Sequence, residues 1–215
     1  MADGKGKSKR PLLVALFTLF LDLLGFGIII PIQPFFAESF GATATLVTLL
    51  GASYSLMQFL FSPFWGRLSD RMGRRPIILF SVAVSAIGHF IFATATGLVT
   101  LFLARALAGF GNANLGTAQA IIADTTSGAD RAKGMGLIGA AFGLGFIFGP
   151  AIGAFLGQHH PTTPLFAAGG LAVLNFVLAF FFLPETLTGE NKATQKRGSV
   201  LSQLRSMRRH VNVTA

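Results

Sequence analysis

Six long apolar runs alternate with short polar segments along this 215-residue chain. The hydrocarbon core of a bilayer is about 30 Å thick, and an α-helix needs roughly 20 apolar residues to cross it. Each run meets that length, so the pattern predicts an all-α membrane protein with six transmembrane helices. The expected spans are residues 12–36, 46–64, 77–95, 98–122, 135–157 and 165–183.

The runs divide the chain into three expected parts. Residues 1–11 are predicted to be a cytoplasmic N-terminus and residues 12–184 a six-helix bundle. From Glu185 the chain becomes polar and basic, so residues 185–215 are predicted to be a cytoplasmic tail. Apolar residues at helical spacing within the tail fit a short amphipathic helix on an anionic leaflet, and a solvated linker fits equally well.

Basic residues mark alternate loops and predict the orientation of the bundle. Sixteen of the 17 Lys and Arg residues lie in the N-terminus, in loops 65–76 and 123–134, and in the tail. The loops at 37–45, 96–97 and 158–164 carry none. Because cytoplasmic loops are enriched in Lys and Arg, both termini are expected in the cytoplasm. An even number of spans requires both termini to lie on the same side of the membrane, which agrees with this assignment.

Composition supports a membrane protein and argues against several other classes. Charged residues make up 12% of the chain, about half their share in a soluble domain, and the mean hydropathy is +0.65. The net charge of +9 would suit a nucleic-acid partner, but the charges mark membrane loops, and no nucleic acid is expected. The chain has no cysteine, no phosphate-binding Gly-Lys-Ser/Thr loop and no nucleophile–base set, so no enzyme, cofactor or metal is expected. His159 and His160 form a lone pair for which a solvated loop is favoured over a metal site.

Polar side chains at mid-membrane depth are the candidate functional groups, because ionisable groups there cost at least about 2.5–3.5 kcal/mol and usually face a bundle interior. Asp22 and Arg105 have opposite charge and overlapping depth. They form either a structural ion pair or, as we favour, a proton-titratable carboxylate tuned by an arginine. For His89, a hydrogen bond to a backbone carbonyl is the favoured interpretation. Asn and Gln side chains in membrane helices often only form hydrogen bonds between helices. The residues expected to line a substrate cavity are Tyr54, Gln58, His89, Asn112 and Asn175.

Residues 66–76, with the sequence GRLSDRMGRRP, carry the most specific motif. Gly73 suits a tight turn, and Pro76 suits the first position of the following helix. The stretch resembles the cytoplasmic loop between the second and third helices of the major facilitator superfamily. The resemblance implies a latch that pairs with the other half of the transporter in the outward-facing state. Its residues here are Gly66, Asp70, Arg71, Gly73, Arg74 and Arg75.

Two further motifs lie in the fourth and fifth spans. Residues 101–111 resemble the fourth-helix motif of the superfamily, in which Arg105 is implicated in proton coupling and Gly109 in packing. Residues 143–153 resemble the fifth-helix motif of its antiporters, and glycines there recur every four residues. Such a stripe lets another helix approach closely, and a proline within it can bend the helix. The motif residues are Gly145, Gly149, Pro150 and Gly153.

Shorter matches at residues 21–31, 122–131 and 183–186 extend the resemblance over about 12–187. Among drug:proton antiporters the chain is most similar to the tetracycline exporters. The resemblance implies proton-coupled efflux of small amphipathic compounds by alternating access, with protons as coupling ion, in a bacterial inner membrane. Gly88 and His89 replace an acidic residue common in tetracycline exporters, which argues against tetracycline itself. A cationic or neutral compound is expected, because Asp22 is the only buried negative charge foreseen.

The length of the chain leaves two hypotheses open. The superfamily has two six-helix bundles, each built from two inverted three-helix repeats, with substrate bound between the bundles. The chain resembles one such bundle. It is therefore expected either to transport as half of a transporter, with a second copy or a separate second bundle, or to be an isolated, non-transporting piece. The association state discriminates between these hypotheses.

Overall fold

The computed structural model describes residues 10–112, 115–126, 128–158 and 160–187. The described part is all-helical, as predicted, and contains no strand. Residues 1–9, His159 and the tail from residue 188 lie outside it, together with the predictions made for them. Its helices are α1 (Arg10–Ile29), α2 (Gln33–Glu38), α3 (Ala44–Met72), α4 (Arg74–Ala93), α5 (Leu98–Gly111), α6 (Leu115–Thr125), α7 (Gly128–Gly157) and α8 (Thr163–Phe182).

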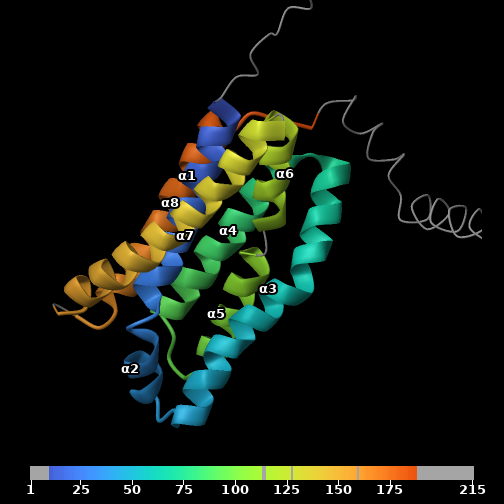
Figure 1. Cartoon of the computed structure of the whole chain (residues 1–215). Helices are drawn as coiled ribbons and strands as arrows, with labels where there is room; N and C mark the ends of the chain where they lie inside the picture. The colour runs from blue at the N-terminus through green and yellow to red at the C-terminus, as the bar shows by residue number, and fades with distance from the viewer. Residues whose placement is uncertain (1–9, 113–114, 127, 159, 188–215) are drawn as a thin grey trace, which may run out of the picture.

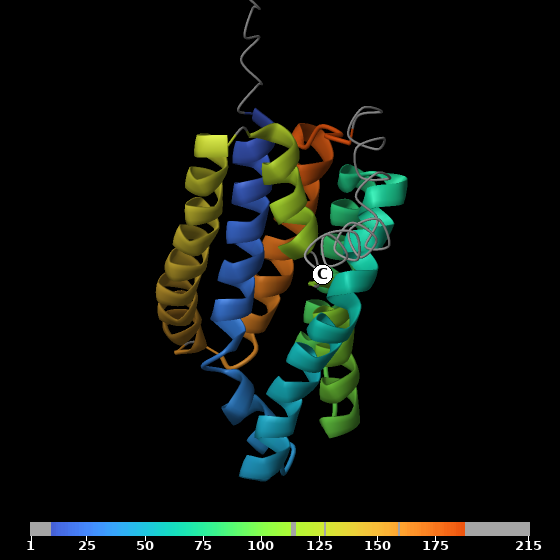
Figure 2. The same ribbon diagram turned by 45° about the vertical axis from the view of Figure 1, so that its right-hand side comes forward.

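Six stretches of the described residues are long and apolar enough to cross a membrane, which confirms the predicted number of spans. They are Arg10–Ile29, Ala44–Met72, Arg74–Ala93, Leu98–Thr125, Asp130–Gly157 and Thr163–Phe182. In the bundle, the start of α1 and the end of α8 lie at the same end as the turn between α3 and α4 (Figures 1 and 2). The ends of the bundle thus share one side, and its assignment to the cytoplasm stays a prediction.

Two predicted boundaries were wrong. The first span was expected to reach residue 36, but α1 ends at Ile29 and α2 is a separate short helix, because Pro31 cannot donate a backbone hydrogen bond and disfavours helix in the residue before it. The fourth span, expected at 98–122, corresponds to the apolar stretch Leu98–Thr125, in which residues 113–114 lie outside the described part. The loop expected at 65–76 shrinks to Gly73, whose φ of 118° breaks the helix, so Pro76 is the third residue of α4.

Glycine contacts set the spacing of the helices. Gly145, Gly149 and Gly153 of α7 all face α1, as the predicted stripe required. A Cβ added to Gly149 would lie 2.6 Å from the Cα of Gly27, so the two backbones touch there. Pro150 also lies at this contact, 3.3 Å from a Cβ added to Gly27.

The helices differ in how much of their surface the bundle covers. In the most apolar stretch of each span, 50% of α1 and 56% of α4 is buried, against 11% of α3 and 22% of α7. Exposed Phe59 of α3 and Ile147 of α7 are among the largest apolar side chains on these helices. The two least covered helices therefore present faces suited to lipid or to another apolar bundle.

Candidate functional site

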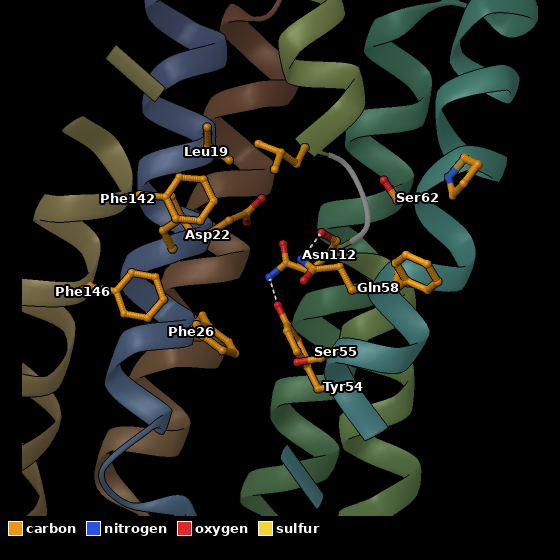
Figure 3. Close-up of a pocket in the computed structure, with 14 residues that line it drawn as sticks. Leu19, Asp22, Phe26, Tyr54, Ser55, Gln58, Ser62, Asn112, Phe142 and Phe146 are labelled. Carbon is orange, nitrogen blue, oxygen red and sulfur yellow. Dashed lines mark hydrogen bonds between the residues drawn. The ribbon is translucent and has the colours of Figure 1, made fainter. Parts of the chain in front are cut away.

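A cavity of about 630 Å³ lies between α1, α3 and α7 (Figure 3). Figure 3 shows the side chains of α1 and α7 on one side, with those of α3 and Asn112 on the other. The volume is within the range of small-molecule sites. Four of the predicted site residues, Asp22, Tyr54, Gln58 and Asn112, line it. The other lining residues are Leu19, Leu23, Phe26, Ser55, Phe59, Ser62, Pro63, Leu115, Phe142 and Phe146.

Hydrogen bonds between helices fix the polar wall of the cavity. The Asn112 side-chain amide donates to the Tyr54 hydroxyl at 2.7 Å, and Gln58 Nε2 donates to the Asn112 carbonyl at 3.0 Å. Tyr54 and Gln58 are one turn apart on α3, whereas Asn112 follows α5. The wall therefore joins the second and fourth spans.

Two residues that sequence reasoning missed support this wall. The indole nitrogen of Trp65 donates to the carbonyl of Phe110 at 2.7 Å, and the Ser81 hydroxyl donates to the carbonyl of Gly111. The last carbonyls of a helix have no partner within it, so side chains from α3 and α4 satisfy them where α5 ends. Trp65 is the only tryptophan in the chain, and that was the one signal that singled it out.

Asp22 is the acidic side chain among the cavity residues, and only 6% of its surface is exposed. Its Oδ1 accepts a hydrogen bond of 2.8 Å from the side-chain amide of Asn175. Asn175 also donates to the Thr18 carbonyl at 3.0 Å and is fully buried. The prediction that Asn175 lines the cavity was therefore wrong, because α8 places it behind Asp22, where it holds the carboxylate in position.

Arg105 also lies behind the cavity wall. Its guanidinium carbon is 5.0 Å from the ring centre of Tyr54, 5.4 Å from that of Phe92 and 5.7 Å from that of Phe26. The ion pairs recorded among the described residues both belong to Arg74, so no salt bridge joins Asp22 and Arg105. The two charges share the centre of the bundle without the direct ion pair that was one of the two interpretations.

His89 does not line the cavity, contrary to prediction. It lies on α4 with 3% of its surface exposed, and within the described part of the chain neither ring nitrogen has a hydrogen-bond partner. The hydrogen bond to a backbone carbonyl considered for it is therefore not formed. Counting residues along α4 gives the depth of His89 but not its rotation about the helix axis, and the structure buries it outside the cavity lining.

The predicted latch motif is bonded within this bundle. Arg74 is 1% exposed and pairs with Asp70 and, at 3.2 Å, with Asp124 at the end of α6. Glu185, just past α8, accepts the backbone N–H of Arg74 at 2.9 Å and that of Arg75 at 3.3 Å. The motif thus joins the ends of α3, α4, α6 and α8, and Glu185 packs with the bundle.

Parts of the same motif face outward. A Cβ added to Gly66 would meet open space, and the Asp70 side chain is 43% exposed. The two positions are one turn apart on α3, so they share a face. Arg71 is also exposed. Pairing of this face with a second bundle stays a prediction.

No three His, Asp or Glu side chains in the described ranges gather closely enough to hold a metal ion. The ionisable and polar groups at the cavity are suited to binding and proton exchange. The apolar and aromatic lining residues suit a hydrophobic small molecule, with a few polar groups to orient it.

Comparison with known proteins gives one consistent result. Residues 15–214 match the Major Facilitator Superfamily. The chain is 39% identical over 186 residues to the class B tetracycline resistance protein of Escherichia coli, covering 85% of this chain and 46% of that protein. It is 30% identical to the quinolone resistance protein NorA of Staphylococcus aureus, covering 87% and 48%.

A solved structure extends the likeness to the fold. The chain is similar to the human organic anion transporter MFSD10 (TETRAN), with a TM-score of 0.77 and 30% identity over 85% of this chain and 49% of that one. The chain thus spans about half the length of the relatives it matches. With six apolar helices, it is a multi-pass membrane protein, and it belongs to the major facilitator superfamily.

Proposed function

We propose that the chain is one half of a proton-coupled exporter of small amphipathic compounds. The observation that carries the proposal is a buried carboxylate, Asp22, in the wall of an otherwise mostly apolar cavity of about 630 Å³. A hydrophobic compound can fill such a cavity, while the carboxylate can bind and release a proton. The similar tetracycline and quinolone resistance proteins support export of drug-like compounds.

In this mechanism Asp22 carries the proton, and Asn175 positions the carboxylate of Asp22. The amide of Asn175 stabilises the ionised carboxylate through a charge-assisted hydrogen bond. When Asp22 takes up a proton, that stabilisation weakens and the buried charge disappears. The neutral carboxylic acid then no longer attracts a positively charged group of the substrate, whether that substrate is a cation or a zwitterion, and the cavity favours a return without substrate. Protonation and substrate binding at Asp22 thus oppose each other, as exchange requires.

Alternating access requires a second six-helix bundle, because one bundle cannot rock against itself. The poorly covered faces of α3 and α7, which flank the cavity, are the surfaces we propose it covers. Gly136, Gly139 and Gly143 of α7 have open space where a Cβ would lie, so this face allows close helix packing. Gly66 and Asp70 provide the outward part of the latch. The site of action would be a bacterial plasma membrane.

A second candidate function is an isolated, non-transporting bundle. It is favoured by the match to only 46–49% of the length of the curated relatives, which carry a second half. In that case the cavity would bind compounds but not move them.

Proton flux in proteoliposomes tests the proposal. The chain is reconstituted, a pH gradient is imposed, and lumenal pH is followed while lipophilic cations, zwitterions and neutral drugs are added. We expect drug-triggered flux that is lost in Asp22→Asn and kept in Asp130→Asn, a matched change at an exposed site at the start of α7. Flux that survives in Asp22→Asn contradicts the role of Asp22. No flux from folded, inserted wild type favours the isolated bundle.

A further inference from the structure

Arg105 is a buried side chain, and two of its three guanidinium nitrogens have no hydrogen-bond acceptor among the described residues. Its side chain is 3% exposed, and Nε and Nη1 are buried without an acceptor among the described residues. Its recorded contacts are with the faces of three aromatic rings. Rings attract the charge of a guanidinium but do not replace the acceptors that its five N–H groups lost on leaving water. The position therefore has unused capacity to bind an acceptor.

His89 adds two more unused nitrogens at the same place. It is three residues before Phe92 on α4, so both side chains lie on the face over which Arg105 extends. Both ring nitrogens of His89 are buried without a partner in the described part of the chain. Together the two side chains present four buried nitrogens without a hydrogen-bond partner among the described residues, and a neutral imidazole donates from one of its two. A carboxylate-like group, with two acceptor oxygens and a negative charge, suits this set, whereas the charge of Arg105 opposes a cation.

The cavity gives access to this place. Phe26 and Tyr54, which cover the guanidinium, are themselves cavity-lining residues, and their rings stack with centres 4.8 Å apart (Figure 3). Arg105 therefore lies one ring-thickness behind the cavity surface. Phe26 is one turn from Asp22 on α1, so the carboxylate and the guanidinium approach the cavity at neighbouring levels. A ligand in the cavity would reach Arg105 by parting one stacked pair of rings.

We propose that Arg105, with His89 beside it, binds the acidic group of an aromatic ligand seated in this cavity. The ligand class is then anions and zwitterions that carry a carboxylate or a similarly ionised oxygen. The expectation of a cationic or neutral compound was drawn from Asp22 alone. Under this proposal the ligand carries an acidic group for Arg105, and a zwitterion also offers a cationic group to Asp22. The proposal rests on the proposed function only in taking the cavity as a binding site, and it requires neither proton coupling nor a second bundle.

Equilibrium dialysis of the full chain in nanodiscs of uncharged phosphatidylcholine tests the proposal. The probes are naphthalene-2-carboxylate and naphthalene-2-carboxamide, which match in ring and size and differ in charge. The variants are Arg105→Met, which keeps the side-chain length without the charge, and Arg105→Lys, which keeps the charge. Arg131→Met, an exposed site in α7, is the matched control. His89→Phe tests the contribution of the imidazole.

We expect wild type and Arg131→Met to bind the carboxylate about 10-fold or more tightly than the carboxamide, because charge-assisted hydrogen bonds in a dry site are strong. The preference should disappear in Arg105→Met, survive in part in Arg105→Lys and weaken in His89→Phe. Equal binding of the two probes by wild type, or binding of neither, overturns the proposal even if Arg105→Met fails to fold. A preference that persists in folded Arg105→Met overturns it as well. Failure of proton flux leaves these results unchanged, so the two proposals fail separately.

Discussion

A single methyl group on α7 should test the packing that positions the cavity. Gly149→Ala places a Cβ 2.6 Å from the Cα and 2.8 Å from the carbonyl carbon of Gly27. The shorter distance is about 0.8 Å less than the 3.4 Å at which ordinary contact begins. Every close atom belongs to the backbone of α1, so no side chain can turn aside. The two helices must separate, and Phe146 of the cavity wall moves with α7.

Gly143→Ala is the matched control for this change. Gly143 lies on the same helix, and a Cβ added there would meet nothing within 4 Å. Replacing Gly by Ala in a helix gains about 0.8–1 kcal/mol in propensity at either site, so that gain cancels in the comparison. Overpacking costs about 1–3 kcal/mol, and we expect Gly149→Ala to be less stable than Gly143→Ala by that amount.

The assay is unfolding of the purified variants in mixed detergent micelles, with helix content followed by circular dichroism. The free energies of unfolding of the two variants are compared with wild type under one set of conditions. Equal free energies for Gly149→Ala and Gly143→Ala would refute the reasoning, because they would show that α1 and α7 are not in backbone contact at Gly27.

Three further changes follow from contacts at the bundle end and beside the cavity. Gly73→Ala should lower the free energy of unfolding by about 1–3 kcal/mol in the same assay, because φ is 118° there and Glu185 occupies the space of the added Cβ. Gly97→Ala, at a site where a Cβ meets open space, should not lower it. Arg74→Met should cost about 1.5–3 kcal/mol in thermal unfolding, because it removes the charged donor shared by Asp70 and Asp124; a melting temperature equal to wild type would contradict this. Trp65→Phe should lower the free energy of unfolding by about 0.5–1.5 kcal/mol, because it removes the hydrogen bond to the Phe110 carbonyl. In the wild type, aqueous acrylamide should quench the tryptophan fluorescence poorly, because Trp65 is 2% exposed.

Depth along the membrane could be predicted from the sequence, and rotation about each helix axis could not. Counting residues put Asp22, Tyr54, Gln58 and Asn112 near one level, and all four line the cavity. The same count placed His89 and Asn175 at that level but could not say which way they face. Their rotation follows from close packing of α4 and α8 with their neighbours.

The glycine stripe of α7 was predictable because a repeat of four residues fixes one face of a helix, whatever that face meets. Contacts between distant segments were not predictable in the same way. Glu185 binds the backbone of Arg74, 111 residues earlier, and nothing in its local sequence indicates that partner. The hydrogen bonds that Trp65 and Ser81 donate at the end of α5 were also missed, because these two residues come from other helices.

The most direct test of the central claim asks whether the wall around Asp22 is a water-filled binding cavity. The chain has no cysteine, so a single cysteine can report on one site. Ser55 lines the cavity, so Ser55→Cys reports on it. Phe148→Cys, at a position of α7 that is 51% exposed and outside the cavity lining, serves as the comparison. Both are treated in proteoliposomes with a charged, membrane-impermeant thiol reagent, with and without an aromatic drug. We predict that Ser55→Cys reacts, that the drug slows the reaction, and that Phe148→Cys stays unreactive. If Ser55→Cys is as unreactive as Phe148→Cys, or the drug has no effect, the cavity is not a transport site.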